Sequence, residues 1–546
     1  MAMGDIRGST GVPRITQMSP VVSFHRHDGG AIWSEGVLPW LIGMQTAKSV
    51  DGSPGTFVLR LVYESAQGDR RDWQGLLADD DWVMLGVQDG DLQWLLMVGM
   101  IDSVTWEREA SDTGAVTEVF VVTGRDLTKP FVETDLLMMP HVSYDPALAY
   151  GTFYSAVQAL SLLGPDFGPG ETVKALYEFM MRAGVYRTED PWWRVPDSLP
   201  LWGQGGRRRG RQLTDLISLD RLDTSVEGSF AAFGSLLAEP GKGSQIWDVL
   251  EGHSHPVLNE LFIDMAPTGN RREDAASAIV ARAGEGFSAL PSLVLRERPF
   301  PVSTEVSAAR AREETWARIP RTMASELETS RISLSRGVER SNYFLVESGG
   351  GSSFSAMVLA QAALAAENGD VATASLFAGV PAIDRDSVQR HGLRRMEIKS
   401  RYLNVDRAGD IDMFTGWTRV IRDWHCLDHL YLAGEVEFVS CLPGVRVGER
   451  LDLTMRGTTY QFYAERVEHS FAIDQNGACV HSTEVGVTRG HPDPLRAVDR
   501  YVQRFGRGGS SVVGRAPSRP AEVTGVIREA VTPIATPLPD GIPGDE

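Results

Sequence analysis

The sequence predicts a mixed, β-dominated fold (α+β), with two antiparallel β-barrels, α-rich insertions and a Pro-rich C-terminal tail. Its 546 residues leave room for roughly three to four domains, which excludes a single small module. A hydrophobic share of 42% is typical of a globular chain and excludes wholesale disorder. The 56 glycines and 29 prolines indicate many turns, and therefore many short strands.

The first β-barrel is predicted over residues 18–139, where four runs are rich in β-branched and aromatic residues and are separated by Gly, Asp and Ser. Strands joined by short turns hide their apolar sides in an antiparallel barrel or in a sandwich, and the residues alone leave both open. The four runs are 57–63, 82–87, 94–101 and 117–123.

An α-rich insertion is predicted over 140–244, because 147–163 and 171–183 carry apolar residues at helical spacing between Gly-Pro breaks. The insertion contains the basic loop GGRRRGR at 205–211. This loop is either a solvated surface or a contact with an acidic partner chain or nucleic acid. The candidate contact residues are Arg207, Arg208, Arg209 and Arg211.

The remaining segments follow from the same patterns of apolar residues. A helix at 246–250 and strands at 260–264 and 293–300 are expected to complete the first barrel over 245–300. The second barrel is expected to start in 301–348, to be interrupted by a helical insertion at 349–398, and to resume over 399–495. The Gly, Ser, Pro and Ala-rich segment 496–546 has too little apolar surface to order itself and is predicted to be a flexible tail.

Charge and cysteine content exclude some classes of protein. With 53 Lys and Arg against 72 Asp and Glu, the net charge of −19 argues against a general nucleic-acid binder. Three cysteines without CxxC spacing cannot form a disulfide framework, so we expect a reducing compartment. No apolar run reaches the ~20 residues of a membrane helix, and residues 1–10 lack the apolar core of a signal peptide, so a soluble protein without a membrane partner is expected.

Common enzyme motifs are absent or incomplete in the sequence. Gly241-Lys242 is not a phosphate-binding loop, because position 236 is Leu236 and Gly243 follows the lysine. Neither G-x-S-x-G nor H-E-x-x-H occurs, so the sequence predicts no catalytic residue and no cofactor. The acidic run 79–81 is interpreted as a solvated face, because neighbouring carboxylates arise by chance among 72 acidic residues.

Histidine pairs offer weak candidates for a metal site. His425 and His429 would share one face of a helix at i,i+4 spacing, with Cys426 or Asp428 as a further ligand. Adjacent residues on a helix do not face one another, which weakens this site. The pairs His25 with His27 and His253 with His255 are interpreted as loop or hydrogen-bonding residues. No metal is therefore predicted.

Four separated groups of segments resemble one family, the hub proteins of tailed-phage baseplates and related contractile injection systems. The first runs from strand 57–63 to a strand ending in Gly124-Arg125-Asp126, and the second from helix 246–250 to Pro299 and Phe300. The third combines 340–345 with 386–394. The last includes Gly444, Gly448, His469 and Phe471, between residues 443 and 490.

This resemblance implies a fold and a role. The barrels would be tube-protein-like, Gly444 and Gly448 would provide tight turns, and Arg125 with Asp126 would fix a turn by a local ion pair. Three chains would form a ring of pseudo-sixfold symmetry that joins a hexameric tube to a trimeric spike. The implied partners are a second and third copy, the tail tube or tube-initiator protein, the spike or tail tip, the tape-measure C-terminus and baseplate wedge proteins.

The resemblance also implies a structural, non-enzymatic protein of the virion tail, assembled in the bacterial host cytoplasm. Three copies would carry 3 × −19 = −57 charges, so DNA would pass through the lumen without specific binding. The alternatives are a type VI secretion spike-like protein and, from another class, a tail-associated cell-wall hydrolase or metal enzyme centred on 425–429.

Overall fold

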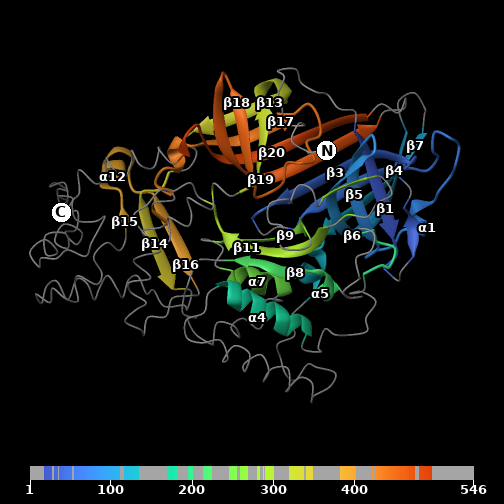
Figure 1. The fold of residues 1–546 in the computed structure, drawn as a ribbon, viewed down its shortest axis with the longest axis horizontal. Coiled ribbons are helices and arrows are strands. Elements are labelled where there is room, and N and C mark those ends of the chain that lie inside the picture. Colours follow the sequence, from blue (N-terminus) through green and yellow to red (C-terminus); the bar gives the residue numbers. More distant parts are fainter. Residues whose placement is uncertain are drawn as a thin grey trace, which may run out of the picture.

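The computed structural model has a β-dominated architecture with few helices, as the sequence predicted (Figure 1). It describes the following residues: 18–27, 30–34, 36–51, 54–110, 116–134, 169–182, 195–200, 213–223, 245–254, 259–267, 279–282, 287, 289–299, 316, 319–336, 340–348, 382–400, 421–422, 425–473 and 479–494. The basic loop 205–211, Phe300, the predicted helix 355–366 and the tail 496–546 lie outside them. Among the described helices, none is long and apolar enough to cross a membrane.

A 14-stranded sheet contains strands from both of the segments predicted as barrels. Alternation of buried and exposed positions produces these strands, as in β4, where every second residue is buried. The strands are β1 (Ser19–His25), β2 (Ala31–Trp33), β3 (Leu41–Ser49), β4 (Thr56–Val62), β5 (Trp82–Asp89), β6 (Leu92–Ala110), β7 (Val116–Asp126), β10 (Val280–Arg282), β12 (Arg321–Ser325), β13 (Thr329–Arg336), β17 (Leu432–Phe438), β18 (Arg450–Met455), β19 (Thr458–Ile473) and β20 (Cys479–His491).

Two sets of six strands within this sheet have the same pairing order. The first set is paired in the order β3-β4-β7-β6-β5-β1, and the second in the order β13-β17-β20-β19-β18-β12. In each set the strands occur along the chain in the same relative sequence. One pairing differs, because β1 and β5 are antiparallel whereas β12 and β18 are parallel.

The two sets also agree in residue register. In the hairpin β6–β7 the pairing register shifts directly after the pair Ile101 and Gly124, and in β19–β20 it shifts directly after Ala464 and Val487. The number of residues that separates Ile101 from Ala464 also separates Gly124 from Val487, so the two hairpins match residue by residue. The shift between positions 41 and 43 of β3 likewise recurs between positions 329 and 331 of β13. We call two residues at the same pairing position of the two sets counterparts.

Counterparts share backbone position but not residue type. In the first set Phe57 lies opposite Gly124, and the Cζ atom of Phe57 fills the space where a side chain of residue 124 would stand. In the second set the counterpart pair is Gly434 opposite Val487, so the large and small side chains change places. Sequence similarity between the sets is therefore weak, although their backbones follow one plan.

Strands β3 and β19 join the two sets into one sheet. Residues 466–472 of β19 extend past the end of β18 and pair with 43–49 of β3, as the central pairing in Figure 1 shows. Each set has its own apolar core, one including Phe24, Leu59 and Trp73 and the other Phe438, Leu453 and Phe462. Phe471 of β19 belongs to the core of the first set, so the sets are joined by packing as well as by backbone pairing.

A separate three-stranded sheet is formed by β8 (Ser218–Asp223), β11 (Ala289–Glu297) and β9 (Asn259–Pro267). This arrangement differs from the prediction that 245–300 completes the first barrel, because only the short β10 pairs with β6. Strand β11 is buried along nearly its whole length, and its apolar residues pack against helices on one side. The α-helices described up to this point of the chain are α1 (Trp73–Leu76), α2 (Lys129–Glu133), α4 (Pro169–Arg182), α5 (Leu213–Leu216) and α7 (Ile246–His253). Of these, α4 and α7 lie below the three-stranded sheet in Figure 1.

A third small sheet contains β14 (Tyr343–Ser348), β15 (Ala382–Ile383) and β16 (Arg395–Ser400), with α12 (Arg385–His391) beside it. Strand β14 therefore does not belong to the second set, although its residues fall in the segment predicted to begin the second barrel. Its partners explain this, because β14 pairs only with strands of the predicted insertion 349–398 or the segment directly after it. The described part also has the short 3-10 helices η3 (Glu326–Glu328) and η4 (Asp428–Leu430).

Candidate assembly site

The Gly-Arg-Asp sequence at the end of β7 occupies a crowded position where strands β4, β6 and β7 meet. A Cβ atom on Gly124 would overlap both Cζ of Phe57 and the carbonyl oxygen of Met100. Each approach would be far shorter than van der Waals contact, so only glycine fits here. Gly124 thus permits Phe57 to pack across β7.

Arg125 and Lys129 form a cationic centre surrounded by carboxylates. The guanidinium of Arg125 donates two hydrogen bonds to Asp102, at 2.8 and 2.9 Å, and pairs with Glu133. The ammonium of Lys129, whose side chain is 1% exposed, lies 2.7 Å from Asp79 and 3.2 Å from Asp102. It also donates to the carbonyl of Ile101. Burial alone would lower the pKa of Lys129, but its hydrogen bonds to Asp79 and Asp80 outweigh burial and raise it.

The acidic run 79–81, interpreted from sequence as a solvated face, therefore holds structure together. Asp79 and Asp80 bind Lys129, and Asp81 accepts hydrogen bonds from two backbone N–H groups. Burial raises the pKa of Asp81. The lysine that these carboxylates surround lies far from them along the chain, so local sequence could not reveal the pairing.

Asp126 binds Lys48, which connects the first set to the three-stranded sheet, and Asp126 does not form the expected ion pair with Arg125. Its carboxylate accepts a 3.0 Å hydrogen bond from the backbone N–H of Thr128 and lies 3.6 Å from Nζ of Lys48. The same Nζ lies 3.8 Å from Asp264 and donates to the carbonyl of Ile263. Successive residues of a strand point to opposite faces, which is why Arg125 and Asp126 take different partners.

The second set also contacts the three-stranded sheet, and Gly448 lies at this contact. Its φ of +77° requires glycine, and a Cβ atom here would lie 2.5 Å from the guanidinium of Arg296. Arg296 donates to the carbonyl of Gly448 and pairs with Glu260 at 2.5 Å, and Glu260 also accepts from the hydroxyl of Tyr463. Burial and the neighbouring carboxylate of Glu260 raise the pKa of Tyr463. Gly444, by contrast, lies in open space and has no positive φ.

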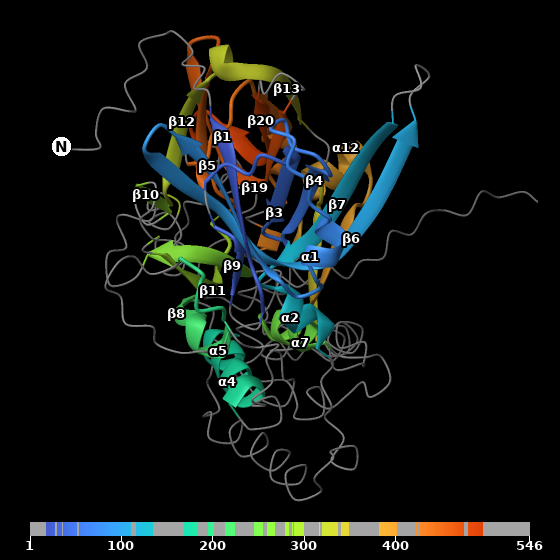
Figure 2. The same ribbon diagram turned by 90° about the vertical axis from the view of Figure 1, so that its right-hand side faces the viewer.

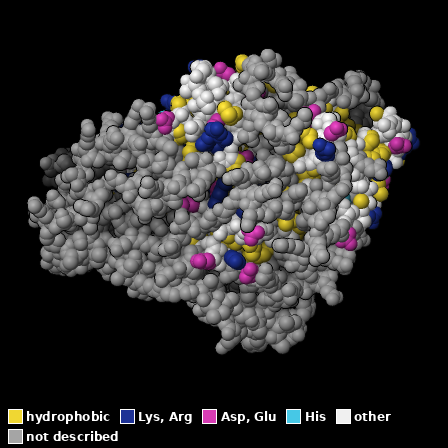
Figure 3. Space-filling model, in the orientation of Figure 1, with side chains coloured by type: hydrophobic (Ala, Val, Ile, Leu, Met, Phe, Trp, Pro, Cys, Tyr) yellow, Lys and Arg dark blue, Asp and Glu magenta, His cyan; other side chains and the backbone are white. Residues whose placement is uncertain are grey.

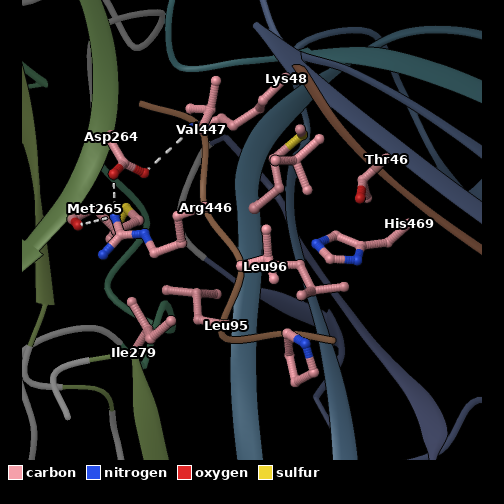
Figure 4. A pocket seen from close by; sticks show the side chains of 14 residues that line it. Thr46, Lys48, Leu95, Leu96, Asp264, Met265, Ile279, Arg446, Val447 and His469 are labelled. Atoms are coloured by element: carbon pink, nitrogen blue, oxygen red, sulfur yellow. Dashed lines mark hydrogen bonds and ion pairs between the residues drawn. The ribbon is translucent and has the colours of Figure 1, made fainter. Parts of the chain in front are cut away.

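A small cavity of about 30 Å³ lies where β3, β6, β9 and β19 approach one another (Figure 4). In this view Asp264 binds Arg446 on one side of β6, and Thr46 and His469 lie on the other. Such a volume holds roughly one water molecule. The site is therefore a packed junction of charged and apolar side chains and does not have the dimensions of a substrate pocket.

His469 and Phe471 lie on β19, where it pairs with β3. The Nδ1 atom of His469 lies 2.9 Å from Oγ1 of Thr483, and burial lowers the pKa of His469 to about 4, so its imidazole is neutral at pH 7. Phe471 is 4% exposed and stands opposite Met44, which is 2% exposed. This buried pairing of β3 with β19 we call the junction.

The other sequence candidates do not gather at one site. His425 forms a 2.7 Å hydrogen bond with Asp428. Burial and the nearby charge of Arg340 lower the pKa of His429. In the part of the chain that the structure describes, no three His, Cys, Asp or Glu residues are arranged to hold a metal ion. Pro299 is buried at the end of β11.

Two of the remaining histidines take part in local hydrogen bonding. His25 lies 2.9 Å from the hydroxyls of both Ser198 and Ser23. His253 contacts the carbonyl of Val249, one helical turn earlier, at 2.7 Å. These contacts agree with the interpretation of these two residues as hydrogen-bonding residues.

Comparison with solved structures finds chains of low identity that cover most of the protein. The 43 kDa tail protein of prophage MuSo2 from Shewanella oneidensis is 10% identical over 87% of this chain and 100% of its own, with a TM-score of 0.39. A tail protein from Neisseria meningitidis is 12% identical over 87% and 99%, with a TM-score of 0.37. The Francisella PdpA-VgrG complex is 8% identical over 88% and 58%, with a TM-score of 0.36.

No family model and no curated protein matches the sequence. Among the solved structures similar to this chain are tail proteins and a PdpA-VgrG complex.

Proposed function

We propose that the chain is a structural protein of a phage-type tail or injection-system baseplate, the hub that joins the tail tube to the central spike or tail tip. One observation carries this proposal: the chain repeats a six-strand plan in the same register and joins the two copies through β3 and β19. A repeated unit of this kind is what a chain needs if it is to contribute two equivalent positions to a ring.

Symmetry determines how many chains the proposed ring contains. Two equivalent units per chain and three chains give six positions for a hexameric tube, while the threefold axis remains for a trimeric spike. Each strand set is proposed to be a tube-protein-like β-barrel. For the second set this agrees with its pairing, since β12 and β13 are consecutive in the chain and lie at opposite ends of the strand order.

The remaining partners follow from this position in the tail. The ring is proposed to contact the tube or tube-initiator protein, the spike, the tape-measure C-terminus and wedge proteins, with Arg207 to Arg211 as one contact. DNA would pass through the lumen without being bound, because three copies carry 3 × −19 = −57 charges. On the face shown in Figure 3, acidic and basic side chains of the described residues are interspersed.

The experiment that tests this proposal is mass photometry of the full chain, followed by binding to purified tail-tube and spike proteins. We expect a particle with three times the 59.7 kDa mass of one chain, and we expect it to bind both proteins. Metal analysis of the same sample provides the comparison with the enzyme alternative. A zinc-loaded monomer of 59.7 kDa that binds neither protein would refute the hub.

A further inference from the structure

The junction within the chain has a defined geometry that can be transferred to a second copy. Strand β19 pairs with β18 over its first half, but its second half extends past β18 and exposes an edge that β3 covers. The register places His469 opposite Thr46 and Glu468 opposite Ala47. A strand edge left open by a short neighbour is therefore closed by the other strand set.

The counterpart of β19 in the first set is β6, which extends past β5 in the same way. Residues 103–110 of β6 pair with β7 on one edge, and among the described residues no strand pairs with the other edge. Figure 2 shows the hairpin of β6 and β7 projecting from the body of the protein. An open edge of this length is a template for another strand.

The counterpart of β3 in the second set is β13. It pairs with β17 along one edge, and no described strand covers the other. Within the part of the chain that the structure describes, one edge is therefore open at the position of β19 and one at the position of β3. Because the two are counterparts of the strands that form the junction, they are complementary to each other.

One pair of side chains at these edges is apolar where the corresponding pair of the junction is buried. Thr46 and His469 of the junction are 3% and 6% exposed. Their counterparts are Leu334, which is partly exposed, and Trp106, which is 46% exposed. Water contact of an apolar tryptophan at an open strand edge is unfavourable, and a strand laid against it would remove that contact.

We propose that β13 of one copy pairs antiparallel with residues 103–109 of β6 in the next copy, repeating the junction between chains. The register transferred from the junction places Trp106 opposite Leu334 and Thr105 opposite Ser335. The inference rests on the proposed ring, for which it supplies the contact between copies. The occupant is a second copy because this chain carries the matching edge, and a head-to-tail contact of this kind forms a ring when its rotation closes.

A disulfide tests the register directly. Residues directly opposite in an antiparallel pair have Cα atoms about 4.5 to 5.5 Å apart, within disulfide range. The double variant Thr105→Cys with Ser335→Cys should therefore give crosslinked dimers and trimers on a non-reducing gel after mild oxidation. The matched control is Thr105→Cys with Ser330→Cys, whose partners would be roughly 17 Å apart and should remain uncrosslinked. Each single variant controls for the native cysteines.

Trp106→Asp provides the second measurement. Because Trp106 is half-exposed in the single chain, we expect the variant to keep the wild-type circular dichroism while association between copies weakens by at least roughly thirtyfold in mass photometry. Leu393→Asp, at a residue that is 57% exposed elsewhere on the molecule, should leave association unchanged.

The outcomes separate this inference from the proposed function. If Trp106→Asp still forms a normal trimer, and the two cysteines introduced at positions 105 and 335 do not crosslink, the ring stands but this interface is overturned. A wild-type chain that remains monomeric would overturn both. Crosslinking at the control positions would show that the pairing register is wrong.

Discussion

The junction of β3 with β19 and the open edges of β13 and β6 have one backbone plan and opposite surroundings. At the junction Met44 and Phe471 are buried, whereas their counterparts Ile332 and Arg108 are partly or largely exposed. The comparison shows that a repeated register does not require repeated side chains. The two junction side chains are core residues, whereas the charged side chain of Arg108 at the open edge extends into water.

Each of the two hairpins has an acidic residue at its β-bulge, Asp102 in β6 and Glu465 in β19, and we call these two residues the bulged acids. Asp102 and Glu465 are counterparts, and each accepts hydrogen bonds from counterparts on the next strand, Arg125 in the first set and Thr488 in the second. Asp102 also lies 3.2 Å from the buried Lys129, and Glu465 lies 4.0 Å from the buried Arg489. The same backbone irregularity therefore supports a cluster of several charges in the first set, and one hydrogen bond with one long ion pair in the second.

Truncation at the junction should have the largest effect on stability. Phe471→Ala removes a ring that is 4% exposed, and we expect it to lower the free energy of unfolding by about 3 to 5 kcal/mol. Arg108→Ala removes the counterpart, whose side chain is 58% exposed, and should change it by less than about 0.5 kcal/mol. Urea titration of both variants measures this. Similar losses in the two would contradict the comparison.

Substitutions of the two bulged acids should differ less in their effect on the free energy of unfolding. Asp102→Ala takes one carboxylate from both Arg125 and Lys129, so we expect a loss of about 2 kcal/mol in the free energy of unfolding. Glu465→Ala removes a hydrogen bond to Thr488 and a 4.0 Å ion pair with Arg489 at a side chain that is 36% exposed, and should cost less than about 1 kcal/mol. Urea titration of both variants measures the two losses. A larger loss for Glu465→Ala would show that the second set depends on its bulge more than its contacts indicate.

A further predicted effect is a pH dependence of stability at the junction. Burial lowers the pKa of His469 from 6.5 to about 4, so the unfolded chain binds a proton at a higher pH than the folded chain. Its contribution is therefore complete above pH 6.5 and is lost as the pH falls toward 4. Between pH 7 and pH 5 the loss should be about 2 kcal/mol.

His469→Asn keeps a side-chain amide near Thr483 but cannot titrate. Between pH 7 and pH 5 its free energy of unfolding should fall by about 2 kcal/mol less than that of the wild type. Urea titrations of both proteins at the two pH values give the difference. The buried His25, whose pKa is also lowered to about 4 by burial, is unchanged in both proteins and cancels. Equal pH slopes would show that His469 is protonated in the folded protein near its ordinary pKa.

Much of the secondary structure could be predicted from sequence because local patterns determine it. The alternation in 57–63 and the helical spacing in 171–183 correspond to β4 and α4. Strand assignment to sheets was harder, as the separate sheet of β8, β9 and β11 shows. Both the first set and this sheet bury apolar strands, and apolar content alone does not say which neighbours cover them.

The site was only partly accessible from sequence. Gly124 and Gly448 were singled out as turn residues, but the reasons they must be glycine, Phe57 and Arg296, lie far away in the chain. Lys48, Lys129 and Tyr463 were missed, because a lone cation or tyrosine gives no signal until its partners are brought together. The repeat itself was hidden by exchanges such as Phe57 with Gly434, which move the large side chain of a pair to the opposite strand.

The position of β19 has a mechanical consequence. It is bonded to β18, β20 and β3 along its length, and the hydrogen bonds of an antiparallel pair run perpendicular to the strands. A pull along β19 would therefore load many of these bonds at once, in shear, whereas a pull across the strand would open them one after another. The two strand sets are thus connected in the direction in which a sheet resists tension best.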